Sequence, residues 1–383
     1  MNNEIIPKGW KKIKLKEVLT EISERNKGER VTIVLSVTNS KGFVNQEEYF
    51  EGTIHSTDIS KYKIIRKNQF AYNPSRVNVG SIDILQAYEE GVLSPMYVVF
   101  EVDTTKLLPE YFKYYFQTNR FYENVKNNTQ GSVRNSLSFK ALADFDYLLP
   151  SITEQEKIVR ILDNVDKIIK KIEKLKNNIK LSKKYIMNIN FGKIINKGKR
   201  MKEACTFFSG GTPSSQNKKY YEGDIPFIRS AEIDNCSTEL KINDEGIKNS
   251  SAKIVKKGDL LVALYGANSG NVAISKIEGA INQAILCIRS NEIKIKYLKY
   301  LLEYDKNNIL NKYLQGGQGN LSAEIIKNLK YDFQIKEEQE KIINILDLIE
   351  NKINMIDILK EQYINVKKGL IQQLLTGKVR VKI

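Results

Sequence analysis

The segment EQEKIVRILDNVDKII, from Glu154 to Ile169, decides the fold because it occurs a second time as EQEKIINILDLIENKI, from Glu338 to Ile353. The copies are 184 residues apart, and nine of their sixteen positions carry the same residue, which is far more than unrelated segments share. The register extends upstream, where Tyr147 matches Tyr331. A repeat of this kind organises the whole chain.

The chain is therefore expected to contain two copies of one unit, each a globular region of roughly 150 residues followed by a long helix. A weaker match links the stretch IRKNQFAYNPSRVNVG, from Ile65, to VKKGDLLVALYGANSG, from Val255. We expect the first globular domain at 1–150, the first long helix at 151–192, the second globular domain at 193–334, and the second helix with a short tail at 335–383.

Both helices carry apolar residues at alternating spacings of three and four, which predicts the seam of a coiled coil. About 35 residues at 1.5 Å each give a helix of about 50 Å. We expect the helices to pack against each other in antiparallel fashion and to end near Gly192 and Gly377. The predicted seam consists of Ile158, Ile161, Val165, Ile168, Ile172, Leu175, Ile179, Ile342, Ile345, Ile349, Ile356 and Leu359.

The globular regions alternate short β-rich runs with turns and helices, so we expect two similar α/β domains within an α+β chain. Examples of strands are MYVVFEV and AILCIRS, and an example of a helix is PEYFKYYFQTNRFYENV.

The charge balance favours a polyanionic partner. There are 61 basic and 45 acidic residues, a net charge of +16, and each phosphate neutralised by Lys or Arg releases counterions. A lysine-rich surface without a nucleic-acid partner is the alternative. No run of eighteen apolar residues and no signal peptide occur in the sequence, so we expect a cytoplasmic protein without membrane segments.

Histidine and cysteine chemistry is largely excluded. The single histidine, His55, argues against most His-based metal sites and Ser-His triads. Cys205, Cys236 and Cys287 are far apart and fit neither a disulfide framework nor a zinc spacing. We therefore expect no metal site.

The stretch YNPSRVNVGSI, from Tyr72 to Ile82, carries an Asn-Pro pair that also occurs in adenine methyltransferases, where Asn-Pro-Pro-aromatic holds a flipped base. Here Ser75 and Arg76 replace the second proline and the aromatic residue. A Gly-rich donor loop after a strand is also missing, and the GGTPSS run at Gly210 has no lysine for a P-loop. These residues are better suited to reading DNA than to modifying it.

Several longer stretches together resemble the DNA-specificity subunit of a type I restriction-modification system, over the whole chain. They are PKGWKKIKLKEV, YNPSRVNVGSI, LSPMYVVF, GGTPSSQNKKYYEGDIPFIRSAEID, ALYGANSGNVAI, INQAI and GLIQQLLTGKVRV.

The resemblance implies two target-recognition domains, each reading one half of a split site in double-stranded DNA. The two helices between them would form an antiparallel coiled coil that sets the gap and docks two methyltransferase subunits. Restriction and translocation subunits would join through that complex. The methyl donor S-adenosylmethionine and the active site would belong to the partners, so this chain would have no cofactor and no catalytic residue.

We expect DNA contacts in polar, Gly-containing loops, because Arg suits guanine edges, Asn suits adenine edges, and both bind phosphates. A tight turn whose polar groups satisfy one another is the alternative. The candidates are Tyr72, Asn73, Arg76, Asn78, Gly80, Ser81, Ser132, Arg134, Asn135, Gly211, Thr212, Arg229, Ser230, Tyr265, Asn268, Ser269, Gln315, Gln318 and Asn320.

Three other functions are weighed against this one. A methyltransferase or nuclease acting alone would need the missing motifs. A coiled-coil scaffold protein would account for the two long helices. It would not explain why the two globular copies share the same repeat register and yet differ in their loops. The third alternative is the specificity subunit of a related restriction enzyme, in which one partner polypeptide carries out both methylation and cleavage. The sequence does not distinguish this alternative from a type I specificity subunit.

Overall fold

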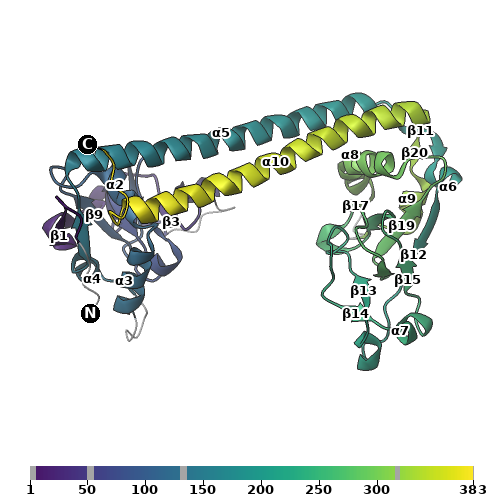
Figure 1. Cartoon of the computed structure of the whole chain (residues 1–383), viewed down its shortest axis with the longest axis horizontal. Coiled ribbons are helices and arrows are strands. Elements are labelled where there is room, and N and C mark those ends of the chain that lie inside the picture. The colour runs from purple at the N-terminus through teal and green to yellow at the C-terminus, as the bar shows by residue number, and fades with distance from the viewer. Residues whose placement is uncertain (1–5, 50–55, 130–135, 315–319, 383) are drawn as a thin grey trace. The chain divides into compact units, whose positions relative to one another are not determined.

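The computed structural model describes residues 6–49, 56–129, 136–314 and 320–382 (Figure 1). Two compact units emerge, Met1–Glu173 with Ile358–Ile383 and Lys174–Asp357. Each unit combines one globular region with about half of each long helix. The predicted repeat is thus present in the structure.

The first unit centres on a four-stranded antiparallel sheet in the order β2-β9-β6-β7. Pairs β1-β10, β3-β4 and β5-β8 lie outside this sheet. The strands are β1 (Lys11–Lys14), β2 (Leu19–Ile22), β3 (Leu35–Thr38), β4 (Gly42–Asn45), β5 (Lys63–Arg66), β6 (Phe70–Tyr72), β7 (Ile82–Ile84), β8 (Glu90–Leu93), β9 (Val98–Val102) and β10 (Asp146–Leu149). The short helices are α1 (Gln46–Tyr49), α2 (Pro109–Tyr115), α3 (Asn119–Thr129) and α4 (Phe139–Ala143).

The second unit contains an equivalent antiparallel sheet in the order β12-β19-β16-β17, beside a second sheet in the order β14-β13-β18-β15. The strands are β11 (Ile195–Arg200), β12 (Thr206–Ser209), β13 (Ile225–Ile228), β14 (Lys241–Ile242), β15 (Lys253–Val255), β16 (Leu260–Ala263), β17 (Val272–Ile274), β18 (Gly279–Ile281), β19 (Ile285–Arg289) and β20 (Lys330–Tyr331). The helices are α6 (Met201–Ala204), α7 (Asp244–Lys248), α8 (Ile295–Leu314) and α9 (Ala323–Asn328).

The two units share the same four-stranded sheet but differ in the additional strands next to it. The four-stranded sheets have the same order and direction, and β1-β10 corresponds to β11-β20. The additional strands differ, since the first unit has two antiparallel pairs and the second has a mixed sheet in which β13 and β18 run parallel. The α+β class with two similar domains is confirmed.

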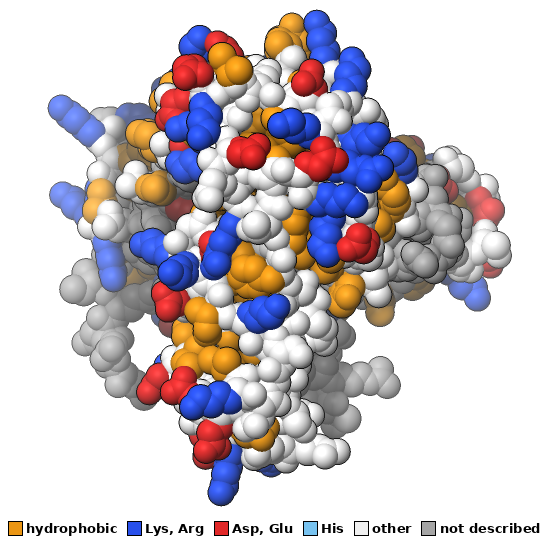
Figure 2. Space-filling view, turned by 90° about the vertical axis from the view of Figure 1, so that its right-hand side faces the viewer, with side chains coloured by type: hydrophobic (Ala, Val, Ile, Leu, Met, Phe, Trp, Pro, Cys, Tyr) orange, Lys and Arg blue, Asp and Glu red, His pale blue; other side chains and the backbone are white. Residues whose placement is uncertain are grey.

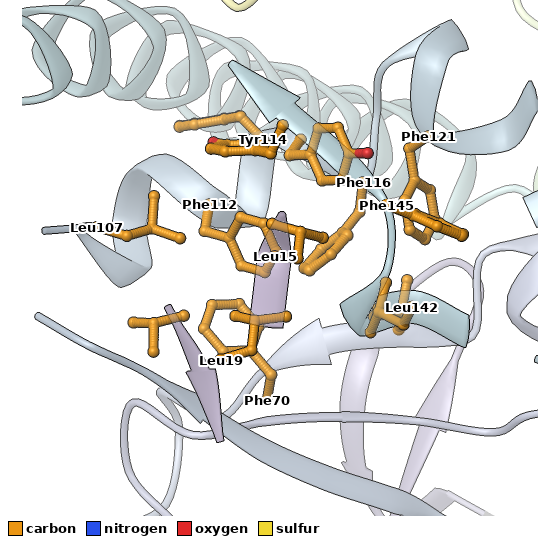
Figure 3. Close-up of a cluster of buried hydrophobic side chains, with 14 of the residues drawn as sticks. Leu15, Leu19, Phe70, Leu107, Phe112, Tyr114, Phe116, Phe121, Leu142 and Phe145 are labelled. Atoms are coloured by element: carbon orange, nitrogen blue, oxygen red, sulfur yellow. The ribbon is translucent and has the colours of Figure 1, made fainter. Parts of the chain in front are cut away.

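An aromatic core lies between the first sheet and its covering helices (Figure 3). Phe70 and Phe100 stack with ring centroids 5.2 Å apart, and Phe112 of α2 meets Phe70 edge-on at 5.6 Å. Aromatic pairs in these arrangements add to the free energy of burial. Figure 3 shows Tyr114 at the border of this cluster, on the side where the long helices run.

The two long helices, α5 (Ile152–Phe191) and α10 (Lys336–Leu374), pack together in antiparallel fashion. In the first unit Asp166 pairs with Lys367 at 2.7 Å, and in the second unit Lys183 pairs with Glu350 at 2.9 Å. Both helices end close to the predicted glycines. Gly377 has φ +68°, a conformation that favours glycine, and a Cβ there would lie 2.3 Å from Pro7.

The predicted seam is half correct. Ile158, Val165, Ile172, Ile342 and Ile356 are buried, and Ile179 and Ile349 are half-buried. The exposed members are Ile161, Ile168, Leu175, Ile345 and Leu359, each with at least 36% of its surface accessible.

The physical reason for this correction is that the helices also cover the globular cores. Leu162 and Leu346, which the prediction left out, are fully buried in the cores of the first and second units. The buried stripe is therefore rotated toward the globular regions, and five residues of the predicted seam are exposed.

Candidate DNA interface

The first unit has a polar hollow of about 290 Å³ beside the turn that joins β6 to β7. That turn faces the β3-β4 hairpin across the hollow. The lining residues are Ser36, Val37, Thr38, Asn39, Tyr49, Asn73, Arg76, Val79, Ser81 and Tyr97. The structure thus brings Asn73, Arg76 and Ser81 of the predicted site together with a hairpin that the prediction did not include.

The turn is held by its own backbone. Asn73 accepts from the Arg76 N–H at 2.9 Å through its carbonyl, and its side-chain oxygen accepts from the Ser75 N–H at 3.1 Å. Gly80 has φ +92° and donates to the Val77 carbonyl. Asn side chains commonly fix turns in this way, and Gly80 is needed because other residues rarely adopt that φ.

Two polar groups in this hollow are short of partners. Asn73 is 8% exposed, and among the described residues its side-chain nitrogen donates to the Met96 sulfur at 3.9 Å, a weak acceptor. The exposed Arg76 guanidinium makes no hydrogen bond or ion pair with any residue in the described part of the chain. Both groups are therefore available to a ligand that enters the hollow.

Three predicted contacts are corrected because their side chains are occupied inside the protein. Tyr72 is fully buried in β6, where its ring meets Phe100 edge-on. Ser81 is 3% exposed and donates to the Val37 carbonyl at 2.7 Å, and Ser269 donates to the Leu264 carbonyl at 2.9 Å. The two serine hydroxyls stabilise the loops rather than face outward.

The corresponding turn of the second unit joins β16 to β17 and has different chemistry. Tyr265 is 38% exposed, Gly266 has φ +74°, and the half-buried Asn268 accepts from Asn271 through its side chain at 3.3 Å. At the positions of Asn73 and Arg76 in the matched stretches, this unit has Ala263 and Gly266. An aromatic side chain, rather than a guanidinium group, is exposed here.

The Gly-Gly-Thr-Pro turn packs tightly against the protein. A Cβ on Gly211 would lie 2.6 Å from Ser251, and the Thr212 hydroxyl lies 2.6 Å from the Gln283 side-chain oxygen. These contacts explain the glycines through packing. Whether the exposed Thr212 also meets DNA stays a prediction.

Arg229 differs from Arg76 because it is already paired. It contacts Glu232 at 2.9 Å and also Glu239, and its hydrogen bonds with these carboxylates raise its pKa above the ordinary value. Its neighbour Ser230 is half-buried. A DNA contact by Arg229 would require it to exchange protein carboxylates for phosphate.

Only some of the remaining predicted contact residues lie in the described part of the chain. Asn78 and Asn320 are exposed. Ser132, Arg134, Asn135, Gln315 and Gln318 lie outside the described residues.

On the face that Figure 2 shows, positive charge is interspersed with other side chains. Figure 2 shows lysine and arginine side chains scattered over one face, with carboxylates and hydrophobic patches between them. In the described ranges no cluster of three or more His, Cys, Asp or Glu side chains could hold a metal ion. The same residues include no helix that is long and apolar enough to cross a membrane.

Comparison with known proteins identifies the family. The model of the type I restriction modification DNA specificity domain matches residues 7–181 and 196–366. The chain is 24% identical to the type I restriction enzyme MjaVIII specificity subunit of Methanocaldococcus jannaschii over 417 residues, which cover 98% of this chain and 94% of the relative.

Two solved structures share the fold. One is a chain from work on complex assembly and conformational transition of the type I R-M system, with TM-score 0.64, 14% identity, and coverage of 98% of this chain and 100% of that chain. The other is the HsdS subunit from Thermoanaerobacter tengcongensis, with TM-score 0.53, 15% identity and 99% coverage of both chains. Because the family model matches both halves of the chain, the protein belongs to the type I restriction-modification DNA specificity family and is a non-catalytic specificity subunit.

Proposed function

We propose that each unit reads one half of a bipartite DNA site, with 1–150 and 193–334 as the target-recognition domains. The observation that carries this proposal is a common scaffold with different loop chemistry. The turn after β6 offers Asn73 and Arg76, whereas the turn after β16 offers Tyr265. Two domains that recognise different half-sites are expected to share a scaffold and to differ in the side chains that contact DNA.

In the first unit, Arg76 and Asn73 are suited to base edges in the major groove. Arg pairs with guanine through two hydrogen bonds. Asn73 can donate through its side-chain nitrogen, whereas its side-chain oxygen already accepts from the Ser75 N–H. The surplus of 16 positive charges supports additional contacts to phosphates, which position the protein without reading sequence. In the second unit, Tyr265, Thr212 and Asn320 are the exposed candidates.

We further propose that the long helices dock two methyltransferase subunits, which would hold S-adenosylmethionine and through which restriction and translocation subunits would join in the cytoplasm. Exposed apolar side chains along both helices support this, because stripes of this kind mark interaction surfaces. In the first unit they are Ile161, Ile168, Ile358, Leu359 and Val366. In the second unit they are Leu175, Leu181, Tyr185, Ile189, Ile345, Leu348 and Met355.

The direct test is to co-express the chain with a methyltransferase subunit from the same genome and to map methylated adenines by single-molecule sequencing. We expect a split motif with two short specific halves and a fixed gap. A continuous motif, or no methylation although the complex forms, would contradict the proposal. Methyl transfer by the purified chain alone would also contradict it, because it would restore the enzymatic alternative.

The helix pair is proposed to set the gap between the half-sites. A helix of about 40 residues is about 60 Å long, and one inserted heptad adds about 10 Å. Inserting one heptad into both α5 and α10 should therefore lengthen the preferred gap without changing either half. An unchanged gap in a folded variant would show that the helices do not determine the spacing.

A further inference from the structure

Tyr114 of α2 connects the first globular region to the helix pair through charged groups. Its hydroxyl lies 2.5 Å from Asp163 and 2.9 Å from Asp166, both on α5. Lys113, beside it on α2, pairs with Asp163 at 3.1 Å. Lys367 of α10 pairs with Asp166 at 2.7 Å and stands over the tyrosine ring at 5.3 Å. One tyrosine thus joins α2 to both long helices.

The second unit repeats this arrangement. The Tyr300 hydroxyl of α8 lies 2.7 Å from Asp347 and 2.9 Å from Glu350, both on α10. Lys183 of α5 pairs with Glu350 at 2.9 Å and stands over the Tyr300 ring at 5.4 Å. Lys299 of α8 pairs with the same Glu350 at 2.6 Å. The roles of α5 and α10 are exchanged between the units, as an internal two-fold repeat requires.

The chemistry makes each network sensitive to the tyrosine hydroxyl. A phenol has one proton, so it cannot fully satisfy two carboxylates, and the lysines must neutralise the rest of the charge. Burial, together with the hydrogen bond to the first carboxylate, raises the pKa of both tyrosines, which keeps the hydroxyl protonated as a donor. Tyr114 and Tyr300 are each 1% exposed, so water does not replace a lost hydrogen bond easily.

Other polar contacts also join α8 to the long helices, among them Lys296 with Asp347, Glu303 with Lys183, and Tyr304 with Asn188. Hydrogen bonds to charged groups are directional and are stronger than neutral ones. A network that ties a domain helix to both long helices restricts its rotation and its sliding along them. Both units contain this arrangement of a tyrosine, two carboxylates and lysines, which indicates a common purpose.

We propose that Tyr114 and Tyr300, with their carboxylates and lysines, are positioning residues that fix each recognition domain on the helix pair and so set the phase of the two half-sites. The effect on DNA rests on the proposed reading of a bipartite site, whereas the effect on domain orientation does not. The two consequences can therefore be measured separately.

The test uses Tyr114→Phe and Tyr300→Phe, with Tyr111→Phe and Tyr297→Phe as matched controls. Each control tyrosine lies one turn away on the same helix, is fully buried, and has a hydroxyl without a hydrogen-bond partner in the described part of the chain. In the assembled methylating complex, the ratio of methylation at the preferred gap to that at gaps one base pair longer or shorter should fall about fivefold or more in the test variants. The controls should keep the wild-type ratio.

A second readout needs no DNA. Spin labels at Lys126 of α3 and Lys170 of α5, in a chain carrying Cys236→Ser to remove the exposed thiol, report the orientation of the first domain by double electron–electron resonance. Tyr114→Phe should broaden the distance distribution, and Tyr111→Phe should leave it unchanged. Lys367→Met, which removes the contribution of α10, should broaden it as well.

The outcomes separate the claims. If the Tyr114→Phe chain melts at a lower temperature but keeps both the narrow distance distribution and the wild-type gap ratio, the tyrosine only adds stability and the proposal is overturned. If the wild-type complex shows no gap preference at all, the bipartite reading fails, and the distance distribution alone decides the positioning role. Broadening together with a lower gap ratio supports both.

Discussion

Glu154 and Glu338 hold the same place in the repeat but have opposite environments. Glu154 is 1% exposed and accepts from the Trp10 indole at 2.9 Å and from Arg380 at 2.7 Å. Glu338 is exposed, and in the described part of the chain its ion pair is with nearby Lys341. The difference arises because the first unit contains both chain termini, where Arg380 also donates to the Lys8 carbonyl at 2.8 Å.

The comparison teaches that the repeat preserves the scaffold and not each interaction. The sheets, the long helices and the tyrosine networks recur, whereas the turns after β6 and β16 and the surroundings of the first repeat residue do not. Changes at two pairs of matched positions, and at Glu350 of the second tyrosine network, would sharpen or break this distinction.

The largest expected effect comes from the buried carboxylate. Glu154→Ala leaves Arg380 and the Trp10 indole without their acceptor, so we expect it to lower the free energy of unfolding by about 3 kcal/mol or more. Glu338→Ala should change it by less than about 0.5 kcal/mol, as is usual at exposed positions. Urea unfolding of both variants measures this. Equal losses would show that the two environments do not differ in energy.

The next largest loss of stability is expected on replacing Gln155 or Gln339, and it should be nearly equal in the two units. Gln155 accepts from the Leu108 N–H and donates to the Lys106 and Pro150 carbonyls, and Gln339 accepts from Lys294 and donates to Gln334.

Both glutamines are buried, so replacement by alanine leaves backbone groups unsatisfied and should cost about 2 kcal/mol in each unit. The urea midpoints of the two variants provide the measurement. A loss of stability in only one of the two variants would show that the two glutamines are not equivalent in the scaffold.

The smallest effect concerns pH. Burial acts to raise the pKa of Glu350, but its hydrogen bonds with Lys299 and Lys183 outweigh this and hold the pKa at about 2, below the ordinary 4.5. A depressed pKa stabilises the fold above the unfolded-state value, and this contribution is lost as the pH falls toward 2.

The stability difference between wild type and Glu350→Gln should therefore be greatest near pH 7 and shrink below about pH 4.5. Glu278→Gln, at an exposed position, is the control and should show little difference at any pH. A Glu350→Gln difference that stays constant from pH 7 to pH 3 would contradict the shifted pKa.

Much of the fold could be predicted because the repeat and the helical periodicity are local signals. Which apolar residues of the long helices are buried could not be predicted. Helix α5 has two apolar stripes, and only the three-dimensional position of the sheet determines that the stripe containing Leu162 is buried. For Tyr72 a usable signal existed. It alternates with Phe70 along β6, and residues two apart in a strand face the same side, here the core.

The site was harder to predict than the fold. Arg76 and Asn73 could be proposed as candidates because their chemistry is visible in one short stretch. The β3-β4 hairpin opposite them, and Tyr97, come from elsewhere in the chain and become neighbours only on folding. The pairing of Arg229 with Glu232 and Glu239 likewise depends on loop geometry, which carries no periodic signal.

The most direct test of the central claim, that each unit reads its own half-site, is to compare methylation maps of the wild-type complex with those of Arg76→Ala and Tyr265→Ala. Arg76→Ala should weaken binding by about 1 to 3 kcal/mol and relax one position in one half of the motif, and Tyr265→Ala should affect only the other half. Lys27→Ala, which removes an exposed charge, is the control and should leave the motif intact. Changes by both variants in the same half, or unchanged maps for both, would contradict the account.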